Sequence, residues 1–115
     1  MYILMQTQRS LDATLAALSD PTRRAILARL AQGEATVNEL AAPFQISQPA
    51  ISRHIKVLAE AGLIVQRVQG TKRPCRLAQG ALSELDQYLE MLRKALEQNY
   101  RRLDRVLEQQ TKKEG

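Results

Sequence analysis

Several polar side chains between residues 48 and 56 have donor and acceptor groups that match base edges and phosphates. Gln48 can form two hydrogen bonds with an adenine, and Arg53 can form two with a guanine. Ser52 can bond either a base or a phosphate, and Lys56 suits a phosphate better than a base. This stretch is therefore a candidate contact with nucleic acid.

The positive charge of the chain is concentrated in the same region. The 115 residues include 17 Lys and Arg and 12 Asp and Glu, which gives a net charge of +5. Residues 47–80 have Glu60 as their one acidic residue and carry the whole surplus, whereas charges balance in residues 1–46 and 81–115. A localised surplus is typical of a polyanion contact, but charge alone leaves a solvated loop equally open.

Two helices are predicted in the first third of the chain, over residues 10–18 and 21–31. Leucines recur on one face of the first helix, and Ser10 can cap its start. Asp20 can accept backbone N–H bonds at the start of the second helix, where Pro21 fits the first turn.

A second pair of helices is predicted over residues 37–43 and 48–60. Thr36 and Glu39 have the spacing of a capping box, and Ser47 can cap the longer helix. The longer helix is apolar on one face and polar and basic on the opposite face. Two helices joined by so short a break are typical of a helix-turn-helix, in which the first holds the second so that its polar face can enter a DNA major groove.

A β-hairpin, or wing, is predicted over residues 63–77, where β-branched residues flank a turn-type segment. Its basic side chains are expected to neutralise DNA backbone charge beside or across the minor groove. Each polar residue alone could be solvated, but their joint placement on one motif predicts DNA contact. For His54, a phosphate contact and a helix-packing role both remain open. The predicted DNA-contact residues are Ser47, Gln48, Pro49, Ser52, Arg53, His54, Lys56, Arg67, Lys72, Arg73 and Arg76.

A long helix is predicted over residues 81–110, with leucines at heptad-like steps of three and four that are interrupted at Asn99. About 30 helical residues span about 45 Å, more than the diameter of a domain built from the first ~80 residues. An intrachain packing helix is the alternative, but this length favours burial of the stripe against a second copy. The predicted dimer-interface residues are Leu11, Leu15, Leu85, Leu89, Leu92, Leu96 and Leu103.

Composition excludes several classes of site and predicts one domain over residues 1–115. The predicted helices and hairpin make this domain mainly α with a small β-hairpin wing. Cys75 is the only cysteine and His54 the only histidine, so neither an intrachain disulfide nor a structural zinc site is expected. No nucleophile with a base and an orienting partner can be assigned, so we expect neither an enzyme nor a cofactor. The longest apolar run is too short for a membrane span or a signal peptide, which predicts a cytoplasmic protein.

Three runs resemble the ArsR/SmtB family of winged helix-turn-helix repressors: Leu18–Leu27, Asn38–Ala41 and above all Ile46–Ile64. The resemblance spans about residues 10 to 90. It implies a homodimer joined through the first and last helices. The two 48–60 helices would then occupy successive major grooves of an imperfectly palindromic operator. Bound there, the protein would block RNA polymerase.

The sequence departs from the metal-sensing members of this family. Those relatives often carry cysteines where this chain has residues 36–40, or histidines on the last helix, which has none here. Metal sensing by those routes is therefore unsupported, and no metal site is expected. Two alternatives to the repressor remain: a winged-helix protein-interaction module, and a thiol- or metal-responsive regulator that uses Cys75, whose pKa Arg73 and Arg76 could lower if the thiol were exposed.

Overall fold

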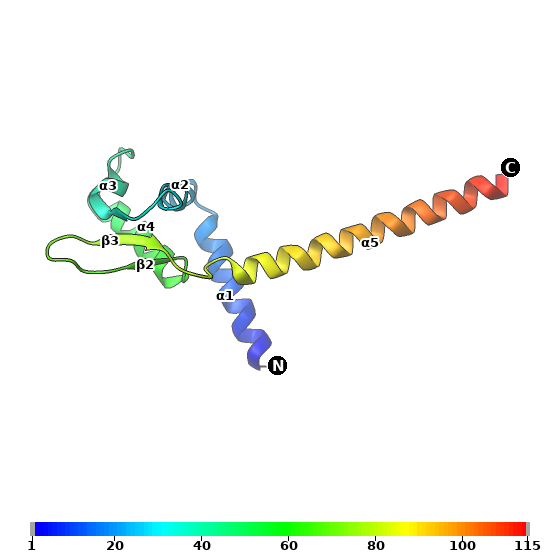
Figure 1. Ribbon diagram of the computed structural model, residues 1–115, viewed down its shortest axis with the longest axis horizontal. Helices are drawn as coiled ribbons and strands as arrows, with labels where there is room; N and C mark the ends of the chain where they lie inside the picture. The colour runs from blue at the N-terminus through cyan, green and yellow to red at the C-terminus, as the bar shows by residue number, and fades with distance from the viewer. Residues whose placement is uncertain (1, 115) are drawn as a thin grey trace. The chain divides into compact units, whose positions relative to one another are not determined.

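The computed structural model describes the backbone of residues 2–114 and the side chains of residues 10–109. It divides into two compact units, Met1–Glu84 and Leu85–Gly115. The chain forms the elements α1 (Tyr2–Leu18), α2 (Pro21–Leu30), β1 (Ala35–Thr36), α3 (Val37–Ala41), α4 (Gln48–Glu60), β2 (Ile64–Gln66), β3 (Pro74–Leu77) and α5 (Ser83–Glu114), labelled in Figure 1.

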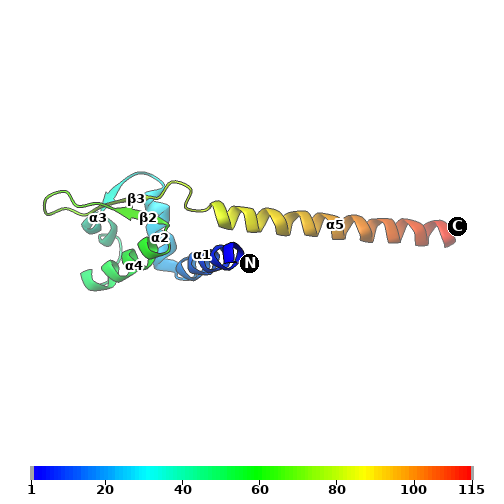
Figure 2. The same ribbon diagram turned by 90° about the horizontal axis from the view of Figure 1, so that it is seen from below.

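The strands form one antiparallel sheet in the order β1-β3-β2. Cys75 of β3 pairs with Gln66 on one side and with Ala35 on the other. The hairpin of β2 and β3 is the predicted wing, and its loop extends beyond the helices in both ribbon views (Figures 1 and 2). β1 was not predicted, because two residues are too few to show strand periodicity and their partner lies about 40 residues away in the sequence.

The core of the first unit lies where α4 meets α1, α2, α3 and the sheet. The apolar face predicted for residues 48–60 is confirmed, since Ile51, Ile55 and Leu58 are all buried. Their burial fixes the rotation of α4, so its polar face must turn outward. The buried apolar residues are Ala17, Ile26, Leu30, Ala35, Leu40, Ile51, Ile55, Leu58, Leu63, Ile64 and Cys75.

The boundaries of four helices differ from the prediction. α1 begins at Tyr2 and not at residue 10, so Ser10 lies inside the helix, where its carbonyl accepts a hydrogen bond from Thr14 Oγ1 at 3.0 Å. Residues 2–9 contain no Gly or Pro to stop the helix earlier. α2 ends at Leu30 and not at residue 31, and α3 ends at Ala41, since Pro43 has no N–H with which to extend it. α5 runs from Ser83 to Glu114, where residues 81–110 were predicted.

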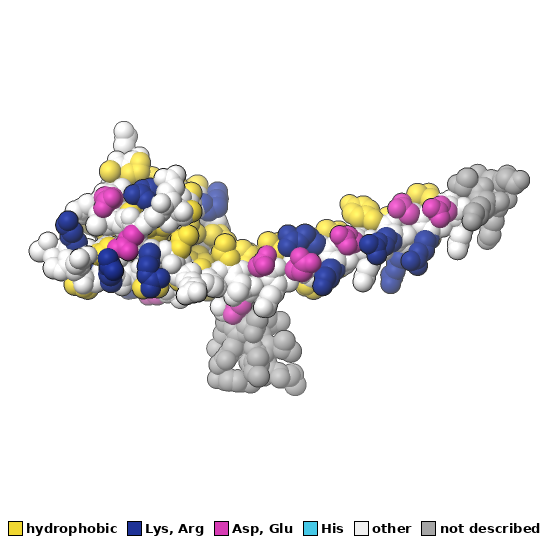
Figure 3. Space-filling view, in the orientation of Figure 1, with side chains coloured by type: hydrophobic (Ala, Val, Ile, Leu, Met, Phe, Trp, Pro, Cys, Tyr) yellow, Lys and Arg dark blue, Asp and Glu magenta, His cyan; other side chains and the backbone are white. Residues whose placement is uncertain are grey.

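Helix α5 has 32 residues and is therefore about 48 Å long. Hydrophobic, basic and acidic side chains are interspersed along it in the space-filling view (Figure 3). Many of its leucines are exposed, including Leu89, Leu92, Leu96 and Leu103. Within the described residues, no helix combines the length and apolar character needed to cross a bilayer.

Candidate nucleic-acid interface

The start of α4 is fixed by a side-chain cap. Ser47 Oγ accepts a hydrogen bond from the backbone N–H of Ala50 at 3.3 Å, and Pro49 lies in the first turn, where its missing N–H costs nothing. The helix then runs from Gln48 to Glu60, the range predicted from the sequence.

The exposed residues of α4 include most of its predicted contact residues. Gln48, Pro49, Ser52, Arg53 and Lys56 are all exposed, because the core holds the opposite face of the helix. The α4 surface thus presents an amide, a hydroxyl and two cations to solvent, which are groups that bond base edges and phosphates.

Helix α3 packs against α4 and is anchored at its own N-terminus. The predicted capping box is present: the Glu39 N–H donates to Thr36 Oγ1 at 3.2 Å, and the Thr36 N–H donates to Glu39 Oε1 at 3.3 Å. Thr36 Oγ1 also donates to Glu39 Oε1 at 3.0 Å. This side-chain bond, followed by the bond from the Thr36 N–H, lowers the pKa of Glu39, so this carboxylate remains charged.

A groove of about 810 Å³ lies between α3, α4 and the wing loop. It brings together contact residues that the sequence placed on two separate elements, namely Gln48, Ser52 and Lys56 of α4 with Lys72 and Arg73 of the loop. The other five exposed candidates, Ser47, Pro49, Arg53, Arg67 and Arg76, do not line this groove. Figure 3 shows basic side chains gathered over the wing region with acidic ones among them.

The wing loop carries its cations next to a tight turn. Gln69 and Lys72 exchange two backbone hydrogen bonds of 3.0 and 2.9 Å, and Gly70 between them has a φ of +62°. This φ lies in the left-handed region, which glycine adopts without strain. Lys72 and Arg73 follow this turn directly and are exposed, so the loop presents two positive charges at its tip.

The basic side chains differ in how far acidic neighbours balance them. Arg67 forms an ion pair with Glu34, with 2.7 Å between Nη2 and Oε1. Lys56 forms a longer one with Glu60, with 4.0 Å between Nζ and Oε1. Arg53 and Lys72 form no ion pair with another described residue. Arg73 and Arg76 form none either, so these four side chains carry the positive charge that an incoming polyanion would meet, with Lys72 near enough to Glu39 to help lower the pKa of that carboxyl.

One polar contact in the groove joins α3 to α4. Gln48 Nε2 donates a hydrogen bond to Asn38 Oδ1, and both residues are exposed and line the groove. Asn38 was not among the predicted site residues, and neither were the groove-lining residues Gln66 and Thr71. The run Asn38–Ala41 resembles the family, but no local pattern assigns a contact to the Asn38 side chain, because the helix-turn-helix brings it to Gln48 from ten positions away.

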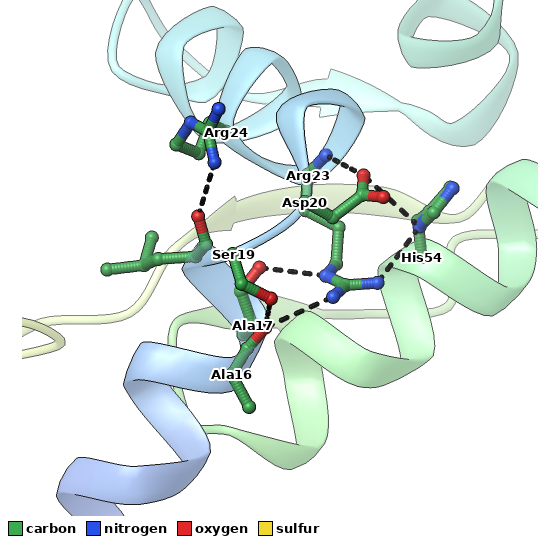
Figure 4. A network of polar contacts seen from close by, with 8 residues as sticks. Ala16, Ala17, Ser19, Asp20, Arg23, Arg24 and His54 are labelled. Atoms are coloured by element: carbon green, nitrogen blue, oxygen red, sulfur yellow. Dashed lines mark hydrogen bonds and ion pairs between the residues drawn. The ribbon is translucent and has the colours of Figure 1, made fainter.

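His54 lies apart from the exposed contact residues and faces the junction of α1 and α2 (Figure 4). Its side chain is 22% exposed, and its Nδ1 lies 3.3 Å from Arg23 Nη1 and 3.9 Å from Asp20 Oδ2. Of the two roles that the sequence left open, this placement favours helix packing over phosphate contact.

Arg23 connects that junction to the end of α1. Its guanidinium donates to the carbonyl of Ala17 at 2.8 Å and to that of Ala16 at 3.1 Å, which satisfies two C-terminal carbonyls of α1 (Figure 4). Its backbone N–H donates to Asp20 Oδ2 at 3.0 Å. This last bond lowers the pKa of Asp20, and the nearby charges of His54 and Arg23 add to the effect.

Cys75 does not have the environment of a reactive thiol. It is 0% exposed in the central strand β3, and burial, together with the negative charge of Glu34, raises its pKa. The sequence left open a lowered pKa near Arg73 and Arg76 if the thiol were exposed, and that condition is not met. No group of three or more metal-ligating side chains is present in the described part of the chain.

The chain is similar to known helix-turn-helix proteins. Residues 18–67 match a helix-turn-helix domain model. The chain is 47% identical to the HTH-type transcriptional regulator Rv2034 of Mycobacterium tuberculosis, over 70% of this chain and 76% of that protein. It is 36% identical to an arsenical resistance operon repressor of Staphylococcus xylosus, over 73% of this chain and 81% of the relative.

Solved structures agree with these matches. An ArsR family transcriptional regulator, RHA00566, has a TM-score of 0.75 and 37% identity, over 78% of this chain and 93% of that one. A homodimeric winged helix-turn-helix DNA-binding domain from Mycobacterium bovis has a TM-score of 0.62 and 25% identity, over 76% and 81%. The two relatives and RHA00566 are each above 30% identity and are matched over more than two thirds of their length, and the chain shares the winged helix. The chain belongs to the ArsR family of helix-turn-helix transcriptional regulators.

Proposed function

We propose that the protein is a homodimeric repressor that binds double-stranded DNA sequence-specifically and does not catalyse a reaction. The observation that carries this proposal is the groove that joins the polar face of α4 to the basic wing loop. A major groove is wide enough for one helix, so Gln48, Ser52 and Arg53 would meet base edges. The adjacent phosphate ridge would lie between α4 and the wing, where Lys72 and Arg73 neutralise its charge.

The homodimer is proposed from the exposed apolar residues of two helices. Leu15 of α1 and Leu89, Leu92 and Leu96 of α5 are exposed in the single chain, and burial against a second copy would remove this apolar surface from water. The homodimeric assembly of the Mycobacterium bovis domain supports this arrangement. Two α4 helices related by a two-fold axis would occupy successive major grooves of an imperfect palindrome and block RNA polymerase there.

This function places the protein with the chromosome in the cytoplasm and makes duplex DNA its ligand. Repressors of this design commonly bind their own promoters, so the DNA upstream of the gene for this chain is the natural probe. In gel-shift assays, the full-length protein is expected to retard this DNA, with log affinity falling linearly as log salt rises. An unrelated duplex of equal length is the control. A flat salt response, or equal affinity for both duplexes, would overturn the proposal.

A further inference from the structure

We infer that Asn38 of α3 determines the base preference of α4 by holding the side-chain amide of Gln48 in one orientation. The inference rests on the proposed DNA-binding function and extends it to a residue that does not itself need to touch DNA. Its basis is the hydrogen bond from Gln48 Nε2 to Asn38 Oδ1 on the wall of the groove.

The two residues are attached to backbone segments that are each held by a cap. Asn38 is the second residue of α3, which begins at the capping box of Thr36 and Glu39. Gln48 is the first residue of α4, which begins at the Ser47 cap. Because α3 and α4 also pack against each other, the freedom left to the pair is mainly that of the two side chains. A hydrogen bond between them removes much of this freedom.

The direction of the bond determines what Gln48 can offer to a base. The Nε2 amide nitrogen has two N–H donors, and Asn38 occupies one of them. One N–H donor and the Oε1 acceptor remain for DNA. Adenine presents one acceptor, N7, and one donor, the N6 amino group, in the major groove, so it matches this pair.

Guanine does not match the same arrangement. It presents two acceptors, N7 and O6, so the Oε1 of Gln48 would face an acceptor and leave a polar contact unsatisfied. A Gln48 side chain without Asn38 can rotate its amide and offer N–H groups in other directions. Asn38 therefore acts as a positioning residue, and its removal is expected to broaden the base preference at one position and leave DNA binding in place.

The test is a selection of binding sites from a randomised duplex library with the full-length protein. The wild type is expected to enrich an adenine at one position of each half-site, and Gln48→Ala is expected to lose this adenine. Asn38→Ala should lower the preference for adenine at that position by about fivefold or more, the scale of one bidentate base contact, while other positions keep theirs. Alanine has a higher helix propensity than asparagine, so α3 should remain folded, as circular dichroism can verify.

Two further variants separate positioning from a general structural effect. Asn38→Asp keeps an acceptor oxygen but offers no N–H, so it should restore the adenine preference, while its negative charge weakens binding to all sequences alike. Gln45→Ala removes an exposed amide from the turn before α4 and should leave the preference unchanged.

The outcomes distinguish this inference from the proposed function. Three outcomes would overturn the inference about Asn38 and leave the proposed function standing. They are adenine enrichment that survives in Asn38→Ala, enrichment that Asn38→Asp does not restore, and enrichment that does not depend on Gln48. A wild-type protein that enriches no sequence would overturn the proposed function and the inference together.

Discussion

Arg53 and Lys72 are exposed basic residues on different elements, and the two side chains suit different parts of a DNA duplex. Arg53 projects from the polar face of α4, and its planar guanidinium can bond the N7 and O6 of one guanine. Lys72 lies beside the turn of the wing, and its ammonium is a point charge with no base preference. Neither forms an ion pair with another described residue, so a substitution at either position is expected to leave the ion pairs of the fold intact.

Arg53→Ala is expected to relax base preference at one position of each half-site. The loss of a bidentate contact should reduce discrimination there by about 1 to 3 kcal/mol. Competition assays with operators substituted at single positions measure this effect. Equal weakening for every operator would instead assign Arg53 to the phosphate backbone.

Lys72→Ala is expected to weaken binding to all sequences alike. The loss of one phosphate contact should reduce the magnitude of the slope of log affinity against log salt by about one. Titrations at four or more salt concentrations, for the wild type, Lys72→Ala and Arg53→Ala, give the comparison. A change in base preference at a single position, with no change of salt slope, would contradict this assignment.

At the scale of elements, the position of α4 depends on contacts made outside its own exposed polar face. Its core residues fix its rotation, Ser47 fixes its start, and α3 packs across it. The Asp20, Arg23 and His54 cluster joins it to the α1–α2 junction (Figure 4). A substitution in this cluster is therefore expected to affect stability before it affects base preference.

The contribution of Asp20 is expected to depend on pH. Because its pKa is lowered from 3.8 in the folded chain, the stabilisation is present above about pH 3.8 and is lost as the pH falls through the folded-state pKa. Asp20→Asn keeps a cap oxygen but cannot ionise. The stability difference between wild type and Asp20→Asn, from urea unfolding at pH 7 down to pH 2, should shrink toward acid. A difference that stays constant over this range would show that the charge of Asp20 plays no part.

For the whole molecule, the exposed leucines of α5 are the strongest sign that the chain packs against a second copy. Leu92 is 38% exposed and Leu96 is 53% exposed, so neither is needed to complete the core of its own chain. A second copy would cover them, and each α4 helix of the dimer would raise the effective concentration of the other at its half-site.

The variant Leu92→Glu/Leu96→Glu is expected to be monomeric in light scattering and to retain the helical content of the wild type. Its affinity for a palindromic operator should fall toward that for a single half-site, since the avidity of the dimer is lost. Lys94→Glu, on the same helix, changes an exposed charge without removing an apolar group and should remain dimeric. A double variant that stays dimeric would move the interface away from this part of α5.

The sequence alone determined the elements whose signals are local. The capping box at Thr36, the cap at Ser47 and the spacing of Ile51, Ile55 and Leu58 predict α3 and α4 and the polar face of α4, because caps and periodicity act within one or two helical turns. The predicted start of α1, at residue 10, is wrong: Ser10 has a side chain suited to a cap, but residues 2–9 contain no helix breaker, and the helix begins at Tyr2.

Contacts between distant segments required the tertiary structure. The pairing of β1 with β3, the ion pair of Arg67 with Glu34 and the burial of Cys75 all join residues far apart in the sequence. The same holds for Asn38, which lies beside Gln48 only because the helix-turn-helix brings two helix starts together. Sequence patterns report which face of an element is apolar, but only the packing of the elements decides which polar side chains meet across a groove.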